Sequence, residues 1–158
     1  MKKYIMTLLK VLIFLIIMFE SMRVVFAFYY WQLIDVEQIP YTEVLKSFVK
    51  SFPIDIATAC YIMVLPAVAM FVGVCINENT KFKWMRWYFY IIIAVYILIV
   101  MGEMGVYGEW RTKLNYKALL YLKNPAEVIN TASTTQTIEL VSMWAAFTLM
   151  FCWWYVKW

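Results

Sequence analysis

The sequence predicts an all-α, polytopic membrane protein with four transmembrane helices and two short helices at the outer interface. Hydrophobic residues make up 65% of the 158 residues and aromatic residues 20%, which exceeds what a soluble core of this size needs. Four segments are apolar over roughly the 20 residues that a helix needs to cross the hydrocarbon core. A helix is the expected form there because its backbone satisfies its own hydrogen bonds where water is absent.

The four spans are expected at about residues 4–30, 54–76, 87–106 and 138–156. They form a single transmembrane domain over residues 1–158. Three of them contain long stretches without a charged residue, namely 56–76, 87–101 and 140–156. The first is interrupted by Lys10, Glu20 and Arg23. Its length, and the charges near its end, favour a retained helix over a cleaved secretory signal.

The placement of lysine and arginine predicts the orientation of the helices. Lys2 and Lys3 precede the first span without any acidic residue, and the short second loop, residues 77–86, is also basic. An even number of spans then leaves both termini in the cytoplasm. The third loop, about residues 107–137, carries four basic residues on the outside against the simple rule. The basic third loop conflicts with the basic N-terminus and second loop. The even number of spans favours the latter, so we expect a cytoplasmic N-terminus.

Both outer loops contain an amphipathic stretch that suits a short helix in the interface plane. In residues 42–50, apolar side chains recur at helical spacing opposite a charged face. In residues 112–123, a stripe of leucine and alanine lies opposite Lys113 and Lys117. These two lysines are the expected interfacial basic residues.

Several kinds of chemistry are excluded by composition. The chain contains no histidine, so it has no imidazole base, no Cys/His zinc pattern and no Ser/His/Asp triad. Its three cysteines, Cys60, Cys75 and Cys152, all fall inside predicted spans, where cysteine packs as a small hydrophobe. We expect no metal site and no cofactor in this chain, and no nucleic acid as a partner.

What remains is a set of polar residues near the outer ends of the spans, called the outer polar cluster: Glu20, Arg23, Asp55, Glu103, Tyr107, Arg111 and Glu139. An ionised side chain at a helix centre costs up to about 2.5–3.5 kcal/mol, so such residues usually face the bundle and pair. Two interpretations stay open. The cluster is either a structural clasp of Arg23 and Arg111 against Asp55 and Glu103, or a polar site for a lipid head group or an external domain.

Two helical segments carry a family resemblance. The stretch Asp55-Ile-Ala-Thr-Ala-Cys-Tyr61 is followed five residues later by Pro66, and Arg23 stands three residues before Phe26. These segments are similar to the second and first helices of the lipoteichoic-acid-synthase-like, sulfatase-family membrane proteins of the Bacteroidetes type.

The third loop extends this resemblance. Glu103, Tyr107 and the stretch 109–115 (Glu-Trp-Arg-Thr-Lys-Leu-Asn) resemble the segment after the third helix of that family. Residues 119–127 (Leu-Leu-Tyr-Leu-Lys-Asn-Pro-Ala-Glu) resemble the Tyr-Leu-x-x-Pro-x-Glu that follows. Together the matching segments cover most of the chain.

In that family a membrane domain of about five helices precedes a large extracytoplasmic domain of the alkaline phosphatase superfamily, which uses a metal-activated threonine. The resemblance implies that this chain anchors and positions a phospholipid head-group transferase or hydrolase, acting on phosphoglycerol or phosphoethanolamine. It also implies the bacterial cytoplasmic (inner) membrane, with membrane lipids and a catalytic domain of the same gene product as partners. Residues 1–158 contain four spans and no catalytic domain, so we expect no catalytic residue and no enzymatic activity in this chain alone. The divalent metal is expected only in the catalytic domain.

A different class of function stays open beside this one. The chain is then a stand-alone four-helix scaffold or accessory subunit that binds a partner through the outer polar cluster. The substrate and the oligomeric state do not follow from the sequence.

The orientation is testable by thiol labelling in whole cells. In a background without the three native cysteines, single cysteines at Gln38 and Asn124 should react with an impermeant thiol reagent, because both loops are expected outside. A cysteine at Asn79, in the basic second loop, should stay unlabelled until the cells are opened. Labelling at Asn79 alone would invert the topology.

Overall fold

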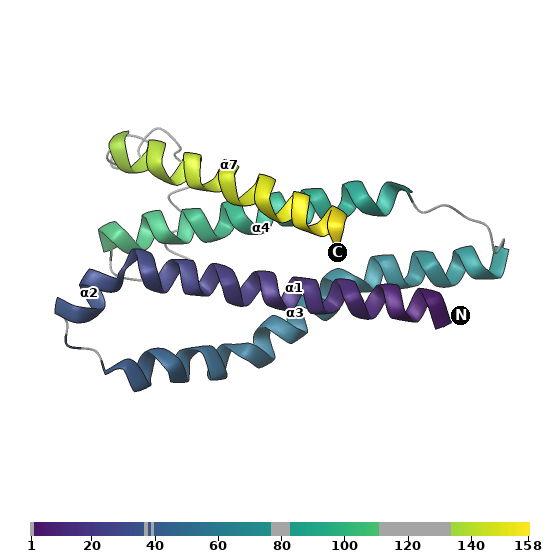
Figure 1. Cartoon of the computed structure of the whole chain (residues 1–158), viewed down its shortest axis with the longest axis horizontal. Helices are drawn as coiled ribbons and strands as arrows, with labels where there is room; N and C mark the ends of the chain where they lie inside the picture. Colours follow the sequence, from purple (N-terminus) through teal and green to yellow (C-terminus); the bar gives the residue numbers. More distant parts are fainter. Residues whose placement is uncertain (1, 37, 39, 77–82, 111–133) are drawn as a thin grey trace. The chain divides into compact units, whose positions relative to one another are not determined.

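The computed structural model describes residues 2–36, 38, 40–76, 83–110 and 134–158, whose regular structure is entirely α-helical. The helices are α1 (Lys2–Tyr29), α2 (Trp31–Val36), α3 (Tyr41–Ile76), α4 (Lys83–Trp110) and α7 (Thr134–Lys157) (Figure 1). Within these ranges four segments are long and apolar enough to cross a membrane: Ile5–Tyr29, Tyr41–Gly73, Trp84–Gly108 and Thr135–Lys157. The prediction of an all-α, multi-pass membrane protein is confirmed.

The chain divides into two compact units, which are described separately. The first comprises residues 1–87 together with Trp158, and the second comprises residues 88–157. The first unit therefore contains α1, α2 and α3. The second contains α7 and most of α4.

The first unit is built on α1 and α3, which lie side by side and run in opposite directions (Figure 1). Arg23 contacts Asp55 toward one end of the pair, and Leu12 and Cys60 line a common groove toward the other. Buried apolar side chains of the two helices include Phe14, Leu15, Met18, Phe19 and Met22 of α1 and Ala59, Met63 and Met70 of α3. Ala59 is fully buried, and such small side chains let two membrane helices approach closely.

A group of aromatic rings holds the connection between α1, α2 and α3. The ring of Trp31, the first residue of α2, stacks on Tyr41, the first residue of α3, at 5.5 Å between centroids and 16° between planes. On its other side Trp31 is stacked 6.2 Å from Phe28 near the end of α1. The backbone of Gln38 has a φ of 51°, a left-handed conformation that lets the chain leave α2 and turn into α3. α2 is not among the helices predicted from the sequence.

α3 is continuous from Tyr41 to Ile76 although Pro53 and Pro66 lie inside it. The helix expected at residues 42–50 is therefore the first part of a longer helix rather than a separate element. A proline removes one backbone donor and crowds the carbonyl four residues earlier, which for Pro53 is that of Val49. This bends a helix without having to end it. The ribbon of α3 changes direction part-way along (Figure 1).

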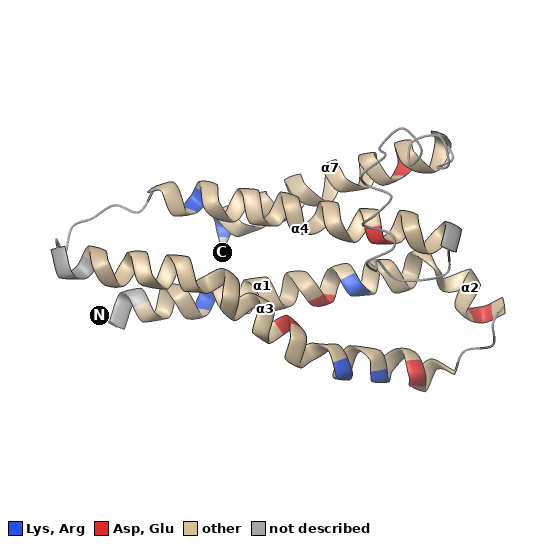
Figure 2. Cartoon of the chain, turned by 180° about the vertical axis from the view of Figure 1, so that it is seen from behind, with Lys and Arg blue, Asp and Glu red and all other residues tan. Residues whose placement is uncertain are grey.

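The length of α3 explains how one helix serves as both span and surface element. Its 36 residues extend about 54 Å at 1.5 Å per residue, whereas the hydrocarbon core is about 30 Å thick. Charged side chains are gathered in the first part of α3, and the remainder is free of them (Figure 2). The first part of α3 therefore suits the membrane surface, and the second part suits the hydrocarbon.

The second unit pairs α4 with α7. The indole Nε1 of Trp144 donates a hydrogen bond of 3.0 Å to the backbone carbonyl of Ala94. The ring of Tyr155 lies 5.3 Å from that of Phe89. A side chain on Gly105 would place its Cβ 3.2 Å from Leu140 Cδ1, so the glycine leaves room for the Leu140 side chain of α7.

The second expected interfacial helix, residues 112–123, lies outside the described residues.

The Trp144 hydrogen bond is expected to stabilise the second unit. Replacing Trp144 by Phe keeps an aromatic ring but removes the donor, and should lower the free energy of unfolding by about 1 kcal/mol. The measurement is unfolding of the purified protein by SDS titration in mixed micelles. Trp153→Phe is the matched control, since Trp153 is exposed and its contact with Lys157 needs only an aromatic face. Equal effects of the two substitutions would show that the hydrogen bond contributes nothing.

Candidate functional site

The candidate site is a group of three charged side chains at the contact between α1 and α3, called here the Arg23 cluster: Glu20, Arg23 and Asp55. Glu20 and Arg23 are three residues apart on α1, a spacing that brings two side chains together on one face of a helix. Glu20 Oε2 lies 3.3 Å from Arg23 Nη1. This contact helps to hold the Arg23 guanidinium on the side of α1 that faces α3.

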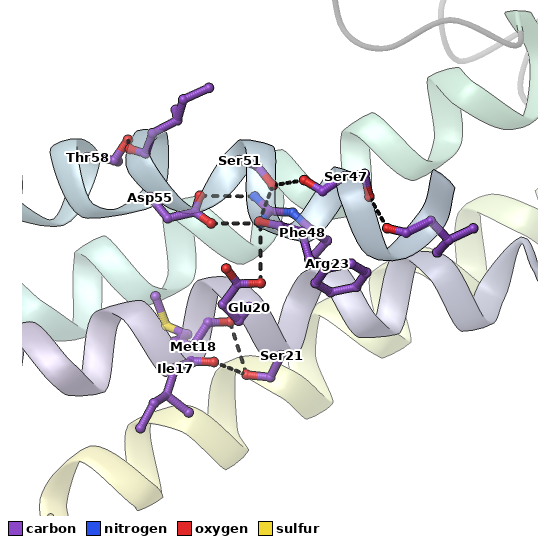
Figure 3. Close-up of polar contacts among 12 residues, drawn as sticks. Ile17, Met18, Glu20, Ser21, Arg23, Ser47, Phe48, Ser51, Asp55 and Thr58 are labelled. Atoms are coloured by element: carbon purple, nitrogen blue, oxygen red, sulfur yellow. Dashed lines mark hydrogen bonds and ion pairs between the residues drawn. The ribbon is translucent and has the colours of Figure 1, made fainter. Parts of the chain in front are cut away.

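Asp55 of α3 completes the cluster with a two-point contact. Arg23 Nη2 donates a hydrogen bond of 3.0 Å to Asp55 Oδ1, and Arg23 Nη1 lies 2.8 Å from Asp55 Oδ2. Figure 3 shows the guanidinium between the two carboxylates, one from each helix. The first contact is a charge-assisted hydrogen bond, and the second brings the guanidinium close to Oδ2 without hydrogen-bond geometry. The pair therefore fixes the position of α1 along α3 as well as their distance.

The face of α3 that meets Arg23 is defined by helical spacing. Phe48, Ser51 and Asp55 follow one another at intervals of three and four residues, which places them on one side of the helix. The Phe48 ring lies 5.9 Å from the guanidinium carbon of Arg23, within range of a cation–π interaction. The hydroxyl of Ser51 donates to the backbone carbonyls of Ser47 and Phe48, so α3 satisfies this polar group itself (Figure 3).

Burial raises the importance of these contacts. The Asp55 side chain is 11% exposed, and those of Arg23 and Glu20 are 24% and 25% exposed. In a span, an ionised group with so little access to water depends on partners in the protein. When all three groups are ionised, the cluster carries one negative charge more than positive.

This geometry provides an electrostatic tie between α1 and α3. The guanidinium is engaged by both carboxylates, and no group of three or more His, Cys, Asp or Glu suited to a metal occurs among the residues that the structure describes. The chemical capacity of the cluster is to hold two helices together and to present its excess negative charge through Glu20, whose carboxylate is more exposed than that of Asp55.

The other residues of the outer polar cluster lie elsewhere. Glu103 and Tyr107 belong to α4 and Glu139 to α7, all in the second unit, while Arg111, Lys113 and Lys117 are outside the described residues. Glu139 is exposed and Glu103 is half-buried. The structure thus brings Arg23 and Asp55 together with Glu20, and a joint cluster with Glu103 and Arg111 stays a prediction.

Sequence reasoning overlooked Phe48 and Ser51 as neighbours of Arg23. The signal was present, since Phe48 and Asp55 are seven residues apart and share one face of a continuous helix. Treating residues 42–50 as a separate helix hides this face, because the face extends across Pro53 into the span.

Comparison with known proteins does not extend the family resemblance. No protein-family model matches the sequence, and neither a curated protein nor a solved structure shows significant similarity to it.

The charge balance of the Arg23 cluster predicts an order of effects. Arg23→Gln leaves two carboxylates without their cation and should destabilise most, on the scale of about 3 kcal/mol for a broken buried pair. Asp55→Asn removes the tie between helices but leaves Arg23 with Glu20, so it should cost less. Glu20→Gln keeps the Arg23–Asp55 pair and removes the excess charge, so it should be nearly neutral. SDS titration of the purified variants measures all three.

The double variant Arg23→Gln with Asp55→Asn serves as the control for this order. If the two groups act chiefly on each other, the double variant should recover part of the loss seen with Arg23→Gln. Strictly additive losses, or an equal loss for Glu20→Gln and Arg23→Gln, would contradict the described pairing.

Proposed function

We propose that this chain is the membrane anchor and positioning domain of a sulfatase-like phospholipid head-group transferase or hydrolase, acting on phosphoglycerol or phosphoethanolamine. Its setting in this proposal is the bacterial cytoplasmic membrane, with the N-terminus in the cytoplasm. The observation that carries the proposal is the Arg23 cluster, in which charge is used to join helices. Positioning requires a bundle with a fixed register, and a two-point ion pair supplies one.

The position of the cluster supports this role. Arg23 lies in the last third of the span Ile5–Tyr29, and Asp55 follows the charged first part of α3. The tie therefore acts close to one membrane surface, where a domain outside the hydrocarbon would attach. In the proposed orientation this surface is the extracytoplasmic one, and membrane lipids surround the remainder of the spans.

A second candidate function is supported by the charge balance of the cluster. The two carboxylates outnumber the single guanidinium, and the Glu20 side chain is 25% exposed. A cationic residue on a partner helix would neutralise the excess. In that case the chain is an accessory subunit or scaffold that holds another membrane protein.

The two candidates differ in what the gene encodes. Sequencing beyond the codon for Trp158 should reveal a reading frame that continues through a further span into an alkaline-phosphatase-like domain. A stop codon directly after Trp158 would contradict the anchor proposal and favour the scaffold. Copurification of a partner that is lost with Glu20→Gln, but retained with the exposed control Glu43→Gln, would support the scaffold directly.

The proposal also predicts that residues 1–158 are inert on their own. The purified chain in detergent should not cleave a chromogenic phosphodiester or sulfate ester at a rate above buffer, because it has no histidine to act as a base and the carboxylates of the Arg23 cluster are engaged by the guanidinium. The assay compares added divalent metal with added chelator. Metal-dependent turnover that Asp55→Asn abolishes would overturn the anchoring role.

A further inference from the structure

One oxygen of Asp55 is a buried acceptor that receives no hydrogen bond from the residues that the structure describes. This atom is Oδ2, in a residue that is 8% exposed. The other oxygen, Oδ1, accepts the hydrogen bond from Arg23 Nη2, whereas the approach of Arg23 Nη1 to Oδ2 at 2.8 Å lacks hydrogen-bond geometry. A buried polar atom without a partner costs free energy and is uncommon in a folded protein. The position of Oδ2 therefore calls for a donor.

The hydroxyl groups near the cluster do not supply this donor. Ser51 and Thr58 lie on either side of Asp55 along α3, and both hydroxyls donate to backbone carbonyls of their own helix. The hydroxyl of Ser21, the residue after Glu20 on α1, donates to carbonyls of α1 in the same way (Figure 3). Within the Arg23 cluster, the side chain that remains as a source of a donor is the carboxyl of Glu20.

Glu20 and Asp55 meet at a single nitrogen atom. Glu20 Oε2 lies 3.3 Å from Arg23 Nη1, and Asp55 Oδ2 lies 2.8 Å from the same atom. The two carboxyl groups are also within hydrogen-bonding reach of each other. Two carboxylates cannot form a hydrogen bond together, because both are only acceptors, but a carboxylic acid donates one to a carboxylate. A proton on Glu20 therefore provides the donor that Asp55 Oδ2 lacks.

The charge balance of the cluster favours the same proton. The charged groups that face Glu20 are Arg23 on its own helix and Asp55 on α3. With both carboxylates ionised, the cluster has one excess negative charge within a span, where an uncompensated charge is costly. When two carboxylates share a site, their repulsion favours retention of a proton on one of them. One proton makes the cluster neutral without a partner protein.

The contacts with the guanidinium indicate which carboxyl keeps the negative charge. Asp55 approaches it with both oxygens, at 3.0 and 2.8 Å, whereas Glu20 makes one contact of 3.3 Å. The negative charge is therefore better stabilised on Asp55. The Glu20 side chain is also the more exposed of the two, at 25% against 11%, which suits the group that exchanges its proton with the surroundings.

We propose that the Arg23 cluster is a proton-binding site, in which Glu20 takes up one proton from water and donates it in a hydrogen bond to Asp55 Oδ2 at neutral pH. Arg23 and Asp55 remain ionised, so the site as a whole is neutral. The inference goes beyond the anchoring role and does not depend on it, because it rests on contacts within the first unit alone.

Infrared spectroscopy of the full chain in lipid bilayers tests this site, because protonated carboxyls and carboxylates absorb at separate frequencies. ¹³C-labelled glutamate separates the glutamate bands from those of aspartate. We expect a protonated-glutamate band at neutral pH that loses intensity with Glu20→Gln and keeps it with the control Glu43→Gln, a substitution of an exposed residue of the same unit. Asp55→Asn should cause the same loss, because Glu20 then faces the guanidinium without a second carboxylate.

Two results would overturn the proposal. If Glu20→Gln leaves the band unchanged, Glu20 is ionised and the excess charge awaits a cationic partner. If Glu20→Gln reduces the band but Asp55→Asn does not, the proton belongs to Glu20 alone and is not shared. Should Asp55→Asn lose helicity, a pH titration of the unchanged chain by solid-state ¹³C NMR takes its place. A shared proton makes the carboxyl signals of Glu20 and Asp55 change over one pH range, and separate transitions count against the site.

Discussion

An arginine inside a membrane span needs its counter-charge within the protein, and the position of α1 on α3 follows from how Arg23 meets this need. Between helices in lipid the hydrophobic effect supplies little attraction, so close packing and polar contacts determine which faces meet. The contacts of 3.0 and 2.8 Å between Arg23 and Asp55 hold one turn of α1 against one turn of α3. Ala59, one turn after Asp55 on the same face of α3, is fully buried.

The continuous helix α3 links the membrane surface to the interior. Its first part carries Glu43, Lys46 and Lys50, and its second part contains no charged residue after Asp55. Asp55 thus stands where the charged part of the helix ends, two residues after Pro53. A bend at Pro53 allows the two parts to follow different directions, so the first part can lie along the surface while Asp55 reaches Arg23.

The spans were predictable from sequence because length and apolarity are imposed by the bilayer itself. The packing faces were not, because a span surrounded by lipid is apolar on all sides and has no polar face to mark the outside. In α7, for example, few residues of the span are buried, although the span is apolar. The pairing of Arg23 with Asp55 was one interpretation of their shared depth, while the participation of Glu20 and Phe48 depended on helical geometry that the sequence left undecided. The helix expected at residues 42–50 and the span expected from residue 54 are joined in one helix, α3, across Pro53, because a proline can bend a helix without ending it.

The central claim is that Arg23 and Asp55 form a two-point ion pair inside the membrane. Solid-state NMR on the full chain in lipid bilayers tests it directly, with ¹⁵N in the arginine guanidinium and ¹³C in the aspartate carboxyl, by measuring the dipolar coupling between them. Two comparison samples, Asp35→Asn and Asp55→Asn, show which aspartate carboxyl gives the signal. The account predicts a strong coupling, consistent with nitrogen–oxygen contacts of 2.8 and 3.0 Å. A spectrum in which the Asp55 carboxyl shows no coupling to any guanidinium nitrogen would contradict it.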